Sequence, residues 1–446
     1  MTEKLSRRKF LQFIGFSAAT LTVAACAAPA APIATTGETT VAEGEPAPSG
    51  KKDVRFHARV GVQGNYYTQM AEKFNAEHPD INVIVEIIPG ENPEYLQKIA
   101  TMIAGGTIGD AMWAASIHNF YNYAAANLYA ALDEFVNADN YDLSVFYPIA
   151  IDSCRYEGQL FGLPWIVHPG RAGLYYNKTA FDAAGLPAPS PEWTYEDLVE
   201  ASVAMTKKEG DRVIQWGFLP DTDYFGLVIP IRSHGGDWIN PEGTKVTVNQ
   251  PEAIAGLEAI ERFYQELGVS PTPTSVSDKP QMWASGQVVM IQSGYWGQSW
   301  GKNYVRDFEW MVAPMPKGPA GSRAMFEFDP NVILRTSKVQ REAWEYLKFL
   351  STKEAGILIA EMGSVPGARP DVWEDDRLAS FQPHAVFTDI MKTVDPLYLP
   401  ANFRSEELFQ IAKNSLDPVW LGEKKVSEVI DEMATQMQAI LDMPRI

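Results

Sequence analysis

Cysteine is scarce in this chain of 446 residues, which has only Cys26 and Cys154. If Cys26 is consumed by lipid attachment, as argued below, no intramolecular disulfide can form in the mature protein. Its stability must then come from packing. Cys154 follows Ile151-Asp152-Ser153, and we expect it to be a small buried apolar residue rather than a nucleophile.

Positive charge is also in short supply. The chain has 37 Lys and Arg against 56 Asp and Glu, a formal net charge of −19. The absence of a long Lys/Arg run argues against nucleic acid or an anionic membrane surface as partner. The acidity is typical of a solvated surface, and a saline habitat is an alternative reading.

Motifs for catalysis and metal binding are missing as well. The six histidines are scattered, and neither an HExxH nor a CxxC pattern occurs. A zinc site is therefore not expected. The sequence also has no G-x-S-x-G nucleophile elbow and no P-loop. We expect no cofactor, no metal and no enzymatic activity.

No hydrophobic run is long enough to span a membrane. The best candidate, residues 11–25, has fifteen residues and includes Gln12, Ser17, Thr20 and Thr22, whereas a spanning helix needs about 20 mostly apolar residues. The flanks suggest export instead. Ser6-Arg7-Arg8-Lys9-Phe10-Leu11 is a twin-arginine pattern, and Val23-Ala24-Ala25-Cys26 is typical of a lipoprotein cleavage site.

We therefore predict that residues 1–25 are a signal peptide and that the mature chain begins at a lipid-bearing Cys26. Its removal would take the net charge from −19 to −22. The protein would be tethered to the outer face of the cell membrane, at the cell surface or in the periplasm. Residues 26–52 are rich in Ala, Pro, Thr, Gly and Glu, which indicates a flexible tether.

The remaining 394 residues are enough for two domains with full cores. The pattern alternates between strand and helix: Val54, Phe56 and Ala58 alternate as in a strand, and Tyr67, Met70, Ala71 and Phe74 then follow a helical period. Apolar residues 81–88 predict a second strand, residues 96–103 a second helix, and residues 111–113 a third strand. This order indicates a parallel α/β sheet covered by helices.

Helical patterns recur further along the chain. Thr194 and Asp197 form a predicted capping box, Pro251 opens a helix, and apolar stripes mark helices around 343–350 and 426–440. We assign these stripes, with Trp193 and Trp344, to the core. Residues 365–404 contain several prolines and little periodicity, and we expect that segment to wrap a surface.

Several segments together resemble one family. They are QKIATMIAGGT at 97–107 leading to Asp110, GQLFGLP at 158–164, YYNK at 175–178 with AGL at 184–186, GGDW at 235–238 with VTVN at 246–249, GQVVM at 286–290 with GYW at 294–296, AWEYLKFL at 343–350 and GSVPGAR at 363–369. In this order they resemble the family 1 extracellular solute-binding proteins, the sugar-binding lipoproteins of ABC importers related to maltose-binding protein. The resemblance covers nearly all of residues 53–446.

The resemblance implies the type II periplasmic-binding-protein fold, an α/β fold with two lobes joined by crossing strands. The crossings would lie near 164–171, 326–331 and 366–367. Lobe one would comprise 53–167 and 329–366, and lobe two 168–328 and 367–446. A solute would bind in the cleft, and the lobes would close on it by a hinge motion. The family implies a monomer whose partners are a small carbohydrate, an ABC permease and its ATPase subunits.

A sugar needs flat aromatic rings for its C–H faces and carboxylates, amides or Arg for its hydroxyls. The candidates stand in turns, at strand ends or in the crossings. They are Gln63, Trp113, Trp165, Arg171, Trp238, Trp296, Glu327, Asp329 and Arg369. The family more often has glycine and small residues where Glu327 and Asp329 stand.

Alternatives remain open for these residues. Each Trp could instead pack in a core, Arg171 and Arg369 could form ion pairs that brace the hinge, and His168 is expected to be a hinge hydrogen-bonding residue. On one strand, Glu327 and Asp329 would point the same way with Cα atoms roughly 6.5–7 Å apart, so their spacing alone does not exclude glycoside cleavage.

Three functions are therefore weighed. A sugar receptor leads, and a receptor for another polyol or a glycerol-phosphate solute would be favoured if basic groups lined the cleft. An exported carbohydrate-active enzyme is the rival from a different class.

Overall fold

The computed structural model describes residues 50–90, 92–115 and 120–445. The twin-arginine pattern, the cleavage-site residues and Cys26 lie outside the described residues, so the structure does not test them. Within the described part, no helix combines the length and the apolar character required to cross a bilayer.

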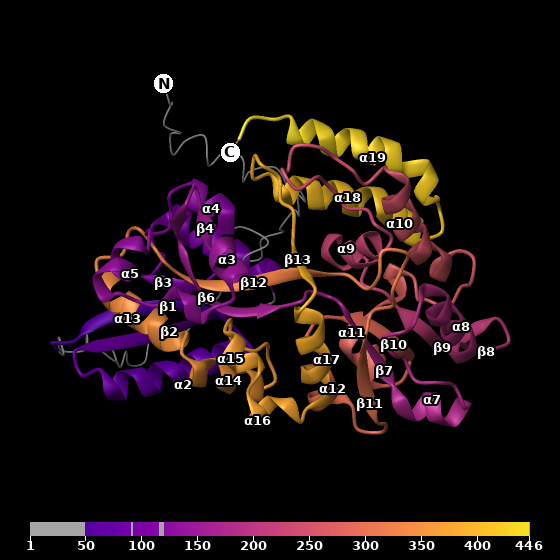
Figure 1. The fold of residues 1–446 in the computed structure, drawn as a ribbon, viewed down its shortest axis with the longest axis horizontal. Helices are drawn as coiled ribbons and strands as arrows, with labels where there is room; N and C mark the ends of the chain where they lie inside the picture. The colour runs from indigo at the N-terminus through magenta and orange to yellow at the C-terminus, as the bar shows by residue number, and fades with distance from the viewer. Residues whose placement is uncertain (1–49, 91, 116–119, 446) are drawn as a thin grey trace, which may run out of the picture.

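Two mixed sheets form the centres of two lobes, seen left and right in Figure 1. The first sheet has the order β13-β12-β3-β1-β2, and β6 also pairs with β12. Its strands are β1 (Lys52–Arg59), β2 (Ile81–Ile88), β3 (Ala111–Trp113), β6 (Gly162–His168), β12 (Ala324–Ile333) and β13 (Val394–Pro396). Strands β1, β2 and β3 are parallel, as the alternation of strand and helix predicts, whereas β12 runs antiparallel to β3 and β6.

The second sheet has the order β11-β7-β10-β9-β8. Its strands are β7 (Gly173–Asn177), β8 (Lys207–Glu209), β9 (Arg212–Leu219), β10 (Val288–Ser293) and β11 (Trp310–Pro314). Strands β9 and β10 are parallel, and the remaining pairs are antiparallel. A small hairpin, β4 (Arg155–Tyr156) and β5 (Gln159–Leu160), belongs to neither sheet.

Helices cover both sheets. Those around the first are α2 (Val62–Glu77), α3 (Asn92–Gly105), α4 (Tyr121–Ala125), α5 (Asp133–Asp139), α6 (Pro148–Ser153), α13 (Gln340–Leu350) and α14 (Lys353–Glu361). The others are α7 (Lys178–Ala184), α8 (Tyr195–Met205), α9 (Tyr224–Ser233), α10 (Pro251–Tyr264), α11 (Lys279–Ala284), α12 (Gly297–Tyr304), α15 (Pro370–Trp373), α16 (Asp376–Ala379), α17 (Gln382–Met391), α18 (Ser405–Trp420) and α19 (Val426–Leu441).

Local predictions hold where the sequence signal is strong. The capping box of Thr194 and Asp197 opens α8. Trp193 and Trp344 are buried, and Cys154 is a free, fully buried thiol. Burial raises the pKa of that thiol well above its ordinary value, so it stays protonated and suits packing better than nucleophilic chemistry. The two-lobed α/β expectation is confirmed.

The prediction for residues 365–404 was wrong. Instead of wrapping a surface, this segment forms α17, which buries Pro383, His384 and Phe387, and then β13, which pairs with β12. Two of its prolines, Pro370 and Pro383, stand in the first turns of α15 and α17, where a missing N–H costs nothing.

Chain crossings lie side by side between the lobes (Figure 1). Strands β6 and β12 pair in antiparallel register, and Ile166 of β6 also bridges to Gly367 on the third predicted crossing. Within the first sheet, β6 and β12 thus pair between the lobes, and Gly367 adds a single bridge to β6; these paired crossings are called the crossing sheet below. The lobe boundaries proposed from the resemblance stay a prediction.

Candidate functional site

The crossing strands present two chemically different faces. Glu327 lies opposite His168 and Asp329 opposite Ile166, and residues opposite each other in a pair project to the same side. Glu327 and Asp329 therefore share one face. Phe326 and Phe328 alternate with them and face the other side.

Arg171 is the centre of the polar face. It lies in the turn between β6 and β7, and its guanidinium meets three carboxylates. Nη1 donates to Glu327 Oε1 at 2.9 Å, Nε to Asp221 Oδ2 at 3.0 Å and Nη2 to Asp223 Oδ2 at 3.0 Å. Lys279 Nζ lies 3.4 Å from Asp221 Oδ1. Three acids thus face two cations, and the cluster keeps a net negative charge.

Asp221 and Asp223 are positioned by the strand-to-helix turn that follows β9. Asp223 is the N-cap of α9, where its Oδ1 accepts from Gly226 N at 2.7 Å, and its second oxygen remains for Arg171. Asp221 is partly buried, which opposes its charge, but Lys279 and Arg171 outweigh that effect and lower the pKa of its carboxyl. Sequence reasoning missed both residues, although an Asp-Thr-Asp pattern directly after a strand was a usable signal.

Trp296 covers the cluster from the end of β10. The Arg171 Cζ atom lies 5.4 Å from the Trp296 ring centroid and 5.1 Å from that of Phe225. His168 meets Trp296 edge-on, with centroids 5.2 Å apart. Trp296 is half-buried, so part of its ring stays accessible for stacking.

His168 is an uncharged member of this face. Burial, followed by the nearby charge of Arg171, lowers the pKa of the His168 imidazole to about 3. The ring is therefore neutral at physiological pH, and its Nε2 lies 3.7 Å from Glu327 Oε2. His168 ends β6, but its Nδ1 has no hydrogen-bond partner among the described residues, so its role as a hinge hydrogen-bonding residue stays a prediction.

In the first lobe, the candidate site consists of residues at the carboxyl ends of the parallel strands. Arg59 ends β1 and lies over Trp113, which ends β3, with Cζ 5.6 Å from the ring centroid. Tyr95 packs against the other residues of this group, with its centroid 5.0 Å from that of Trp113. Gln63 stands in the first turn of α2. Ligands of α/β sheets gather at these carboxyl ends.

Some buried polar atoms at this edge have no hydrogen-bond partner among the described residues. They are Gln63 Oε1, Trp113 Nε1 and His168 Nδ1. Buried polar groups are normally satisfied by protein, water or ligand. An acceptor and an indole N–H at the strand ends suit a hydroxyl, which both donates and accepts.

Another residue predicted to contact the solute, Trp238, is packed in the protein core. Trp238 is 1% exposed in the second lobe, stacks on Tyr224 at 4.5 Å and donates from Nε1 to the Tyr224 carbonyl. The Gly-Gly turn predicted a loop, but not that the ring points inward. Because the ring is buried, stacked on Tyr224 and engaged through its N–H, we remove Trp238 from the candidate site.

Trp165 and Arg369 also have structural partners. Trp165 packs against Tyr66 and Tyr67, with centroids 5.5 and 4.7 Å away. Arg369 forms a two-point ion pair with Asp371, at 2.9 and 2.8 Å. This local pair engages the guanidinium, and a hinge-bracing role of Arg369 stays a prediction.

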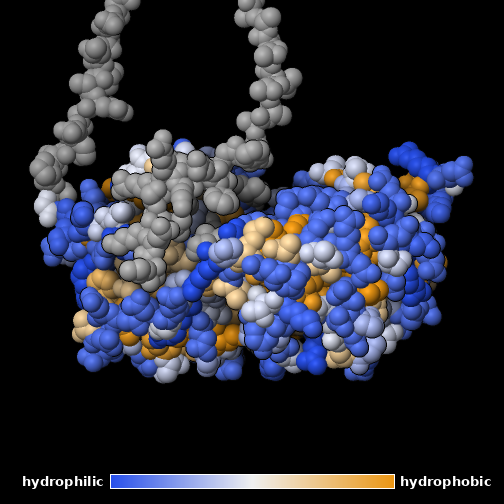
Figure 2. All heavy atoms as spheres, turned by 90° about the horizontal axis from the view of Figure 1, so that it is seen from above, coloured by the Kyte–Doolittle hydropathy of each residue, from blue (hydrophilic) through white to orange (hydrophobic). Residues whose placement is uncertain are grey.

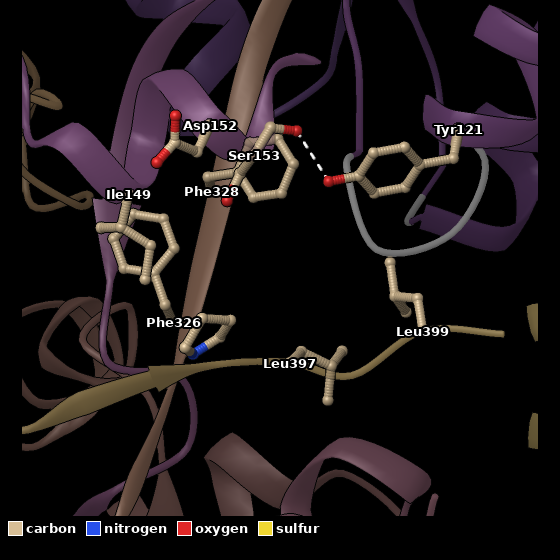
Figure 3. A pocket seen from close by; sticks show the side chains of 9 residues that line it. Tyr121, Ile149, Asp152, Ser153, Phe326, Phe328, Leu397 and Leu399 are labelled. Atoms are coloured by element: carbon tan, nitrogen blue, oxygen red, sulfur yellow. Dashed lines mark hydrogen bonds between the residues drawn. The ribbon is translucent and has the colours of Figure 1, made fainter. Parts of the chain in front are cut away.

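The opposite face of the crossing borders a cavity of about 470 Å³ (Figure 3). Phe326 and Phe328 form its floor. Tyr121, Ile149, Asp152, Ser153, Pro396, Leu397 and Leu399 complete the lining. Seen from above, the surface is mostly hydrophilic, with hydrophobic patches near the middle between the lobes (Figure 2). No local sequence pattern predicts this cavity, because its lining residues come from four separate segments.

Comparisons with known proteins bear on the family and the fold. A family model described as bacterial extracellular solute-binding protein matches residues 60–357. A Brucella abortus protein named only as a binding protein is 25% identical over 384 residues, 85% of this chain and 90% of that one. The lactose-binding protein of Rhizobium radiobacter is 24% identical over 310 residues, 67% of this chain and 70% of its own length.

Solved structures show the same fold. An ABC substrate-binding protein from Listeria monocytogenes, in complex with cycloalternan, has a TM-score of 0.77 at 20% identity and covers 88% of this chain and 99% of its own. UgpB from Mycobacterium tuberculosis, in complex with glycerophosphocholine, also has a TM-score of 0.77, at 17% identity, with coverage of 88% and 99%.

Proposed function

The chain belongs to the bacterial extracellular solute-binding protein family, and from that premise we propose that it binds a mono- or oligosaccharide between its lobes and delivers it to an ABC-type importer. One observation carries the choice of a sugar. The polar face holds Asp221, Asp223 and Glu327 around Arg171, with Asp329 further along the same strand. Carboxylates accept hydrogen bonds from sugar hydroxyls.

Binding would combine stacking with hydroxyl recognition. The half-buried ring of Trp296 offers a flat face for the C–H side of a sugar. Gln63 and Trp113 at the first-lobe edge hold unpartnered polar atoms that hydroxyls can engage. Lobe closure would exclude water and strengthen each of these contacts.

A glycerol-phosphate solute is the second candidate, supported by the M. tuberculosis UgpB structure and its glycerophosphocholine. Arg59 and Arg171 are the cations that could meet a phosphate. The acids around Arg171 argue against it, since their negative charge repels an anion and already uses the guanidinium donors. The enzyme alternative is set aside, because the family consists of binding proteins.

The test begins with a thermal-shift screen against sugars, polyols and glycerol phosphates. A solute at 100 times its Kd stabilises the protein by about 2.7 kcal/mol. Calorimetric titration of the best solute into Asp329→Ala should then show binding weakened roughly 10- to 150-fold, the range for losing a charge-assisted hydrogen bond. Trp296→Ala should also bind more weakly.

Trp216→Ala is the matched control, because Trp216 is equally half-buried but lies at the opposite end of the second sheet. It should bind the solute as wild type does. A glycerol phosphate that binds more tightly than every sugar would overturn the substrate assignment. Unchanged affinity in both Trp296→Ala and Asp329→Ala would remove these residues from the site.

We also propose that the mature protein is held at the membrane by an acylated Cys26, on the evidence of the export and cleavage patterns in residues 6–26. That it is a monomer is proposed from the family resemblance alone. Mass spectrometry of the membrane fraction should detect the modified N-terminal cysteine. A Cys26→Ala protein should move to the soluble fraction, and equal membrane retention would contradict lipid attachment.

A further inference from the structure

The cavity on the apolar face of the crossing is unlike the carboxylate face. Aromatic and aliphatic side chains dominate its wall: Tyr121, Phe326, Phe328, Ile149, Leu397 and Leu399. No Lys or Arg is among its lining residues in the described part of the chain. Figure 3 shows these side chains arranged around an open space.

The polar side chains of the wall are those of Tyr121, Asp152 and Ser153. The first two offer a polar ligand few free hydrogen-bonding atoms. The Tyr121 hydroxyl donates to the Ser153 carbonyl at 2.7 Å, which fixes the ring and engages its donor. Asp152 is exposed, so its carboxylate remains hydrated at the rim. A carboxylate without a neighbouring lining cation disfavours anions. The wall therefore suits an uncharged apolar group.

The crossing sheet separates this cavity from the carboxylates. Phe326 and Phe328 alternate with Glu327 and Asp329 along β12, which pairs with β13 at Ala324–Phe326 and with β6 from Glu327 onward. A sugar held by Glu327 would lie on the other side of that sheet. A sugar bound at the carboxylates would therefore not fill this cavity.

We propose that this cavity is a second, apolar site that binds an uncharged aromatic or aliphatic molecule of about one or two rings. Its volume of about 470 Å³ lies within the range of small-molecule pockets. The site does not depend on the sugar assignment, because none of its lining residues belongs to the carboxylate face.

Occupancy of this site should be coupled to the arrangement of the lobes. Tyr121 and Ser153 come from helices of the first lobe, Phe328 from the crossing, and Leu397 and Leu399 from the segment that leads to α18 in the second lobe. A molecule that contacts all three parts binds best at one separation of the lobes. Any ligand that changes that separation changes the affinity, and the reverse effect is equal.

The experiment uses the neutral fluorescent probe N-phenyl-1-naphthylamine, titrated into the purified full-length mature protein. We expect saturable binding with one probe per chain. Leu399→Trp, which fills the half-exposed side of the cavity, should abolish saturable binding, and Leu399→Ala should weaken it about fivefold through lost apolar contact. Circular dichroism and the melting temperature check that both variants are folded.

Ile87→Trp is the matched control, because Ile87 is an exposed apolar residue on β2, outside the cavity. It should leave probe binding unchanged. Absence of saturable binding to wild type, or equal binding by wild type and a folded Leu399→Trp, would overturn the proposal.

Discussion

Arg171 shows how a single side chain organises the polar face. Its donors face three carboxylates from three different segments: the turn after β9, the N-cap of α9 and the crossing strand β12. The Arg171 side chain is 14% exposed, so water only weakly screens its pairs with Glu327 and Asp221, whereas Asp223 is more exposed. Arg171 therefore fixes the crossing to the second lobe as well as neutralising part of the site.

Replacement of Arg171 by Met should cost stability as well as binding. It would leave Glu327, which is 6% exposed, without its main counter-charge. Loss of one partner of a buried pair typically costs about 3–5 kcal/mol. Urea denaturation should show this loss in Arg171→Met, whereas Arg212→Met, at an exposed position on β9, should change stability by less than about 0.5 kcal/mol. Equal stability of both variants would mean that the Arg171 cluster does not stabilise the folded state.

His168 should make stability depend on pH. Its pKa of about 3 lies below the value of about 6.5 in an unfolded chain. Between these values the unfolded state binds a proton that the folded state does not, so stability is lost as pH falls from about 6.5 toward 3. The full slope for one such group is about 1.4 kcal/mol per pH unit.

Urea denaturation of wild type and His168→Gln at pH 7, 6, 5 and 4 isolates this contribution from that of the carboxylates. Stability of the variant should fall less steeply below pH 6.5. Parallel curves for the two proteins would show that His168 does not carry the pH dependence.

Individual site residues were predictable only in part. The family resemblance places Glu327 and Asp329 on one crossing strand, and strand alternation then predicts that their side chains point the same way. The cluster of Asp221 and Asp223 around Arg171 could not, since it depends on the packing of segments about 50 residues apart. Trp238 shows the same limit. The sequence places this tryptophan after a Gly-Gly turn, but only the fold determines that its ring points into the core.

At the scale of elements, the third crossing is held against α14 by two glycines. Gly367 N donates to the Gly356 carbonyl at 3.1 Å. A Cβ at Gly367 would lie 2.5 Å from Gly356 Cα, a backbone atom that cannot turn aside. Close contact of two backbones thus fixes where the chain passes between the lobes.

Gly367→Ala should therefore destabilise the protein, by about 1–3 kcal/mol as expected for overpacking. Gly105→Ala is the control, for which no loss of stability is expected. Gly105 ends α3, and a Cβ there would meet only Thr107 Oγ1 at 3.9 Å, so alanine should leave stability unchanged or raise it by up to about 1 kcal/mol. Melting temperatures and urea midpoints of both variants check this, and a neutral Gly367→Ala would show that the crossing can shift.

Elements with regular patterns were predictable, and those set by tertiary contact were not. Strand β2 and helix α19 follow from continuous apolar spacing. Strand β13 has three residues and exists because β12 offers it an edge, which no local pattern reveals. Helix α17 was missed because prolines dominate the neighbouring segment.

At the scale of the whole molecule, the C-terminal segment links the two lobes opposite the crossings. Arg445 forms an ion pair with Glu157 at 2.8 Å and also donates to the Tyr156 hydroxyl, both on the β4–β5 hairpin of the first lobe. Its Cζ lies 5.0 Å from the Tyr156 ring and 4.6 Å from the Phe403 ring. Asn402 ties this end of the chain to the last turn of α19.

Because these contacts join segments from both lobes, they should favour the closed arrangement. An exposed ion pair is worth about 0–1 kcal/mol, and a shift of that size in the opening equilibrium lowers solute affinity by up to about fivefold. Arg445→Ala should therefore weaken solute binding about two- to fivefold and increase the radius of gyration of the unliganded protein in small-angle X-ray scattering. Its melting temperature should stay near that of wild type, since no core residue is lost. Arg212→Ala removes an equally charged, exposed side chain from the second lobe and should change neither quantity. If Arg445→Ala matches wild type in both affinity and radius of gyration, the C-terminal contact does not hold the lobes together.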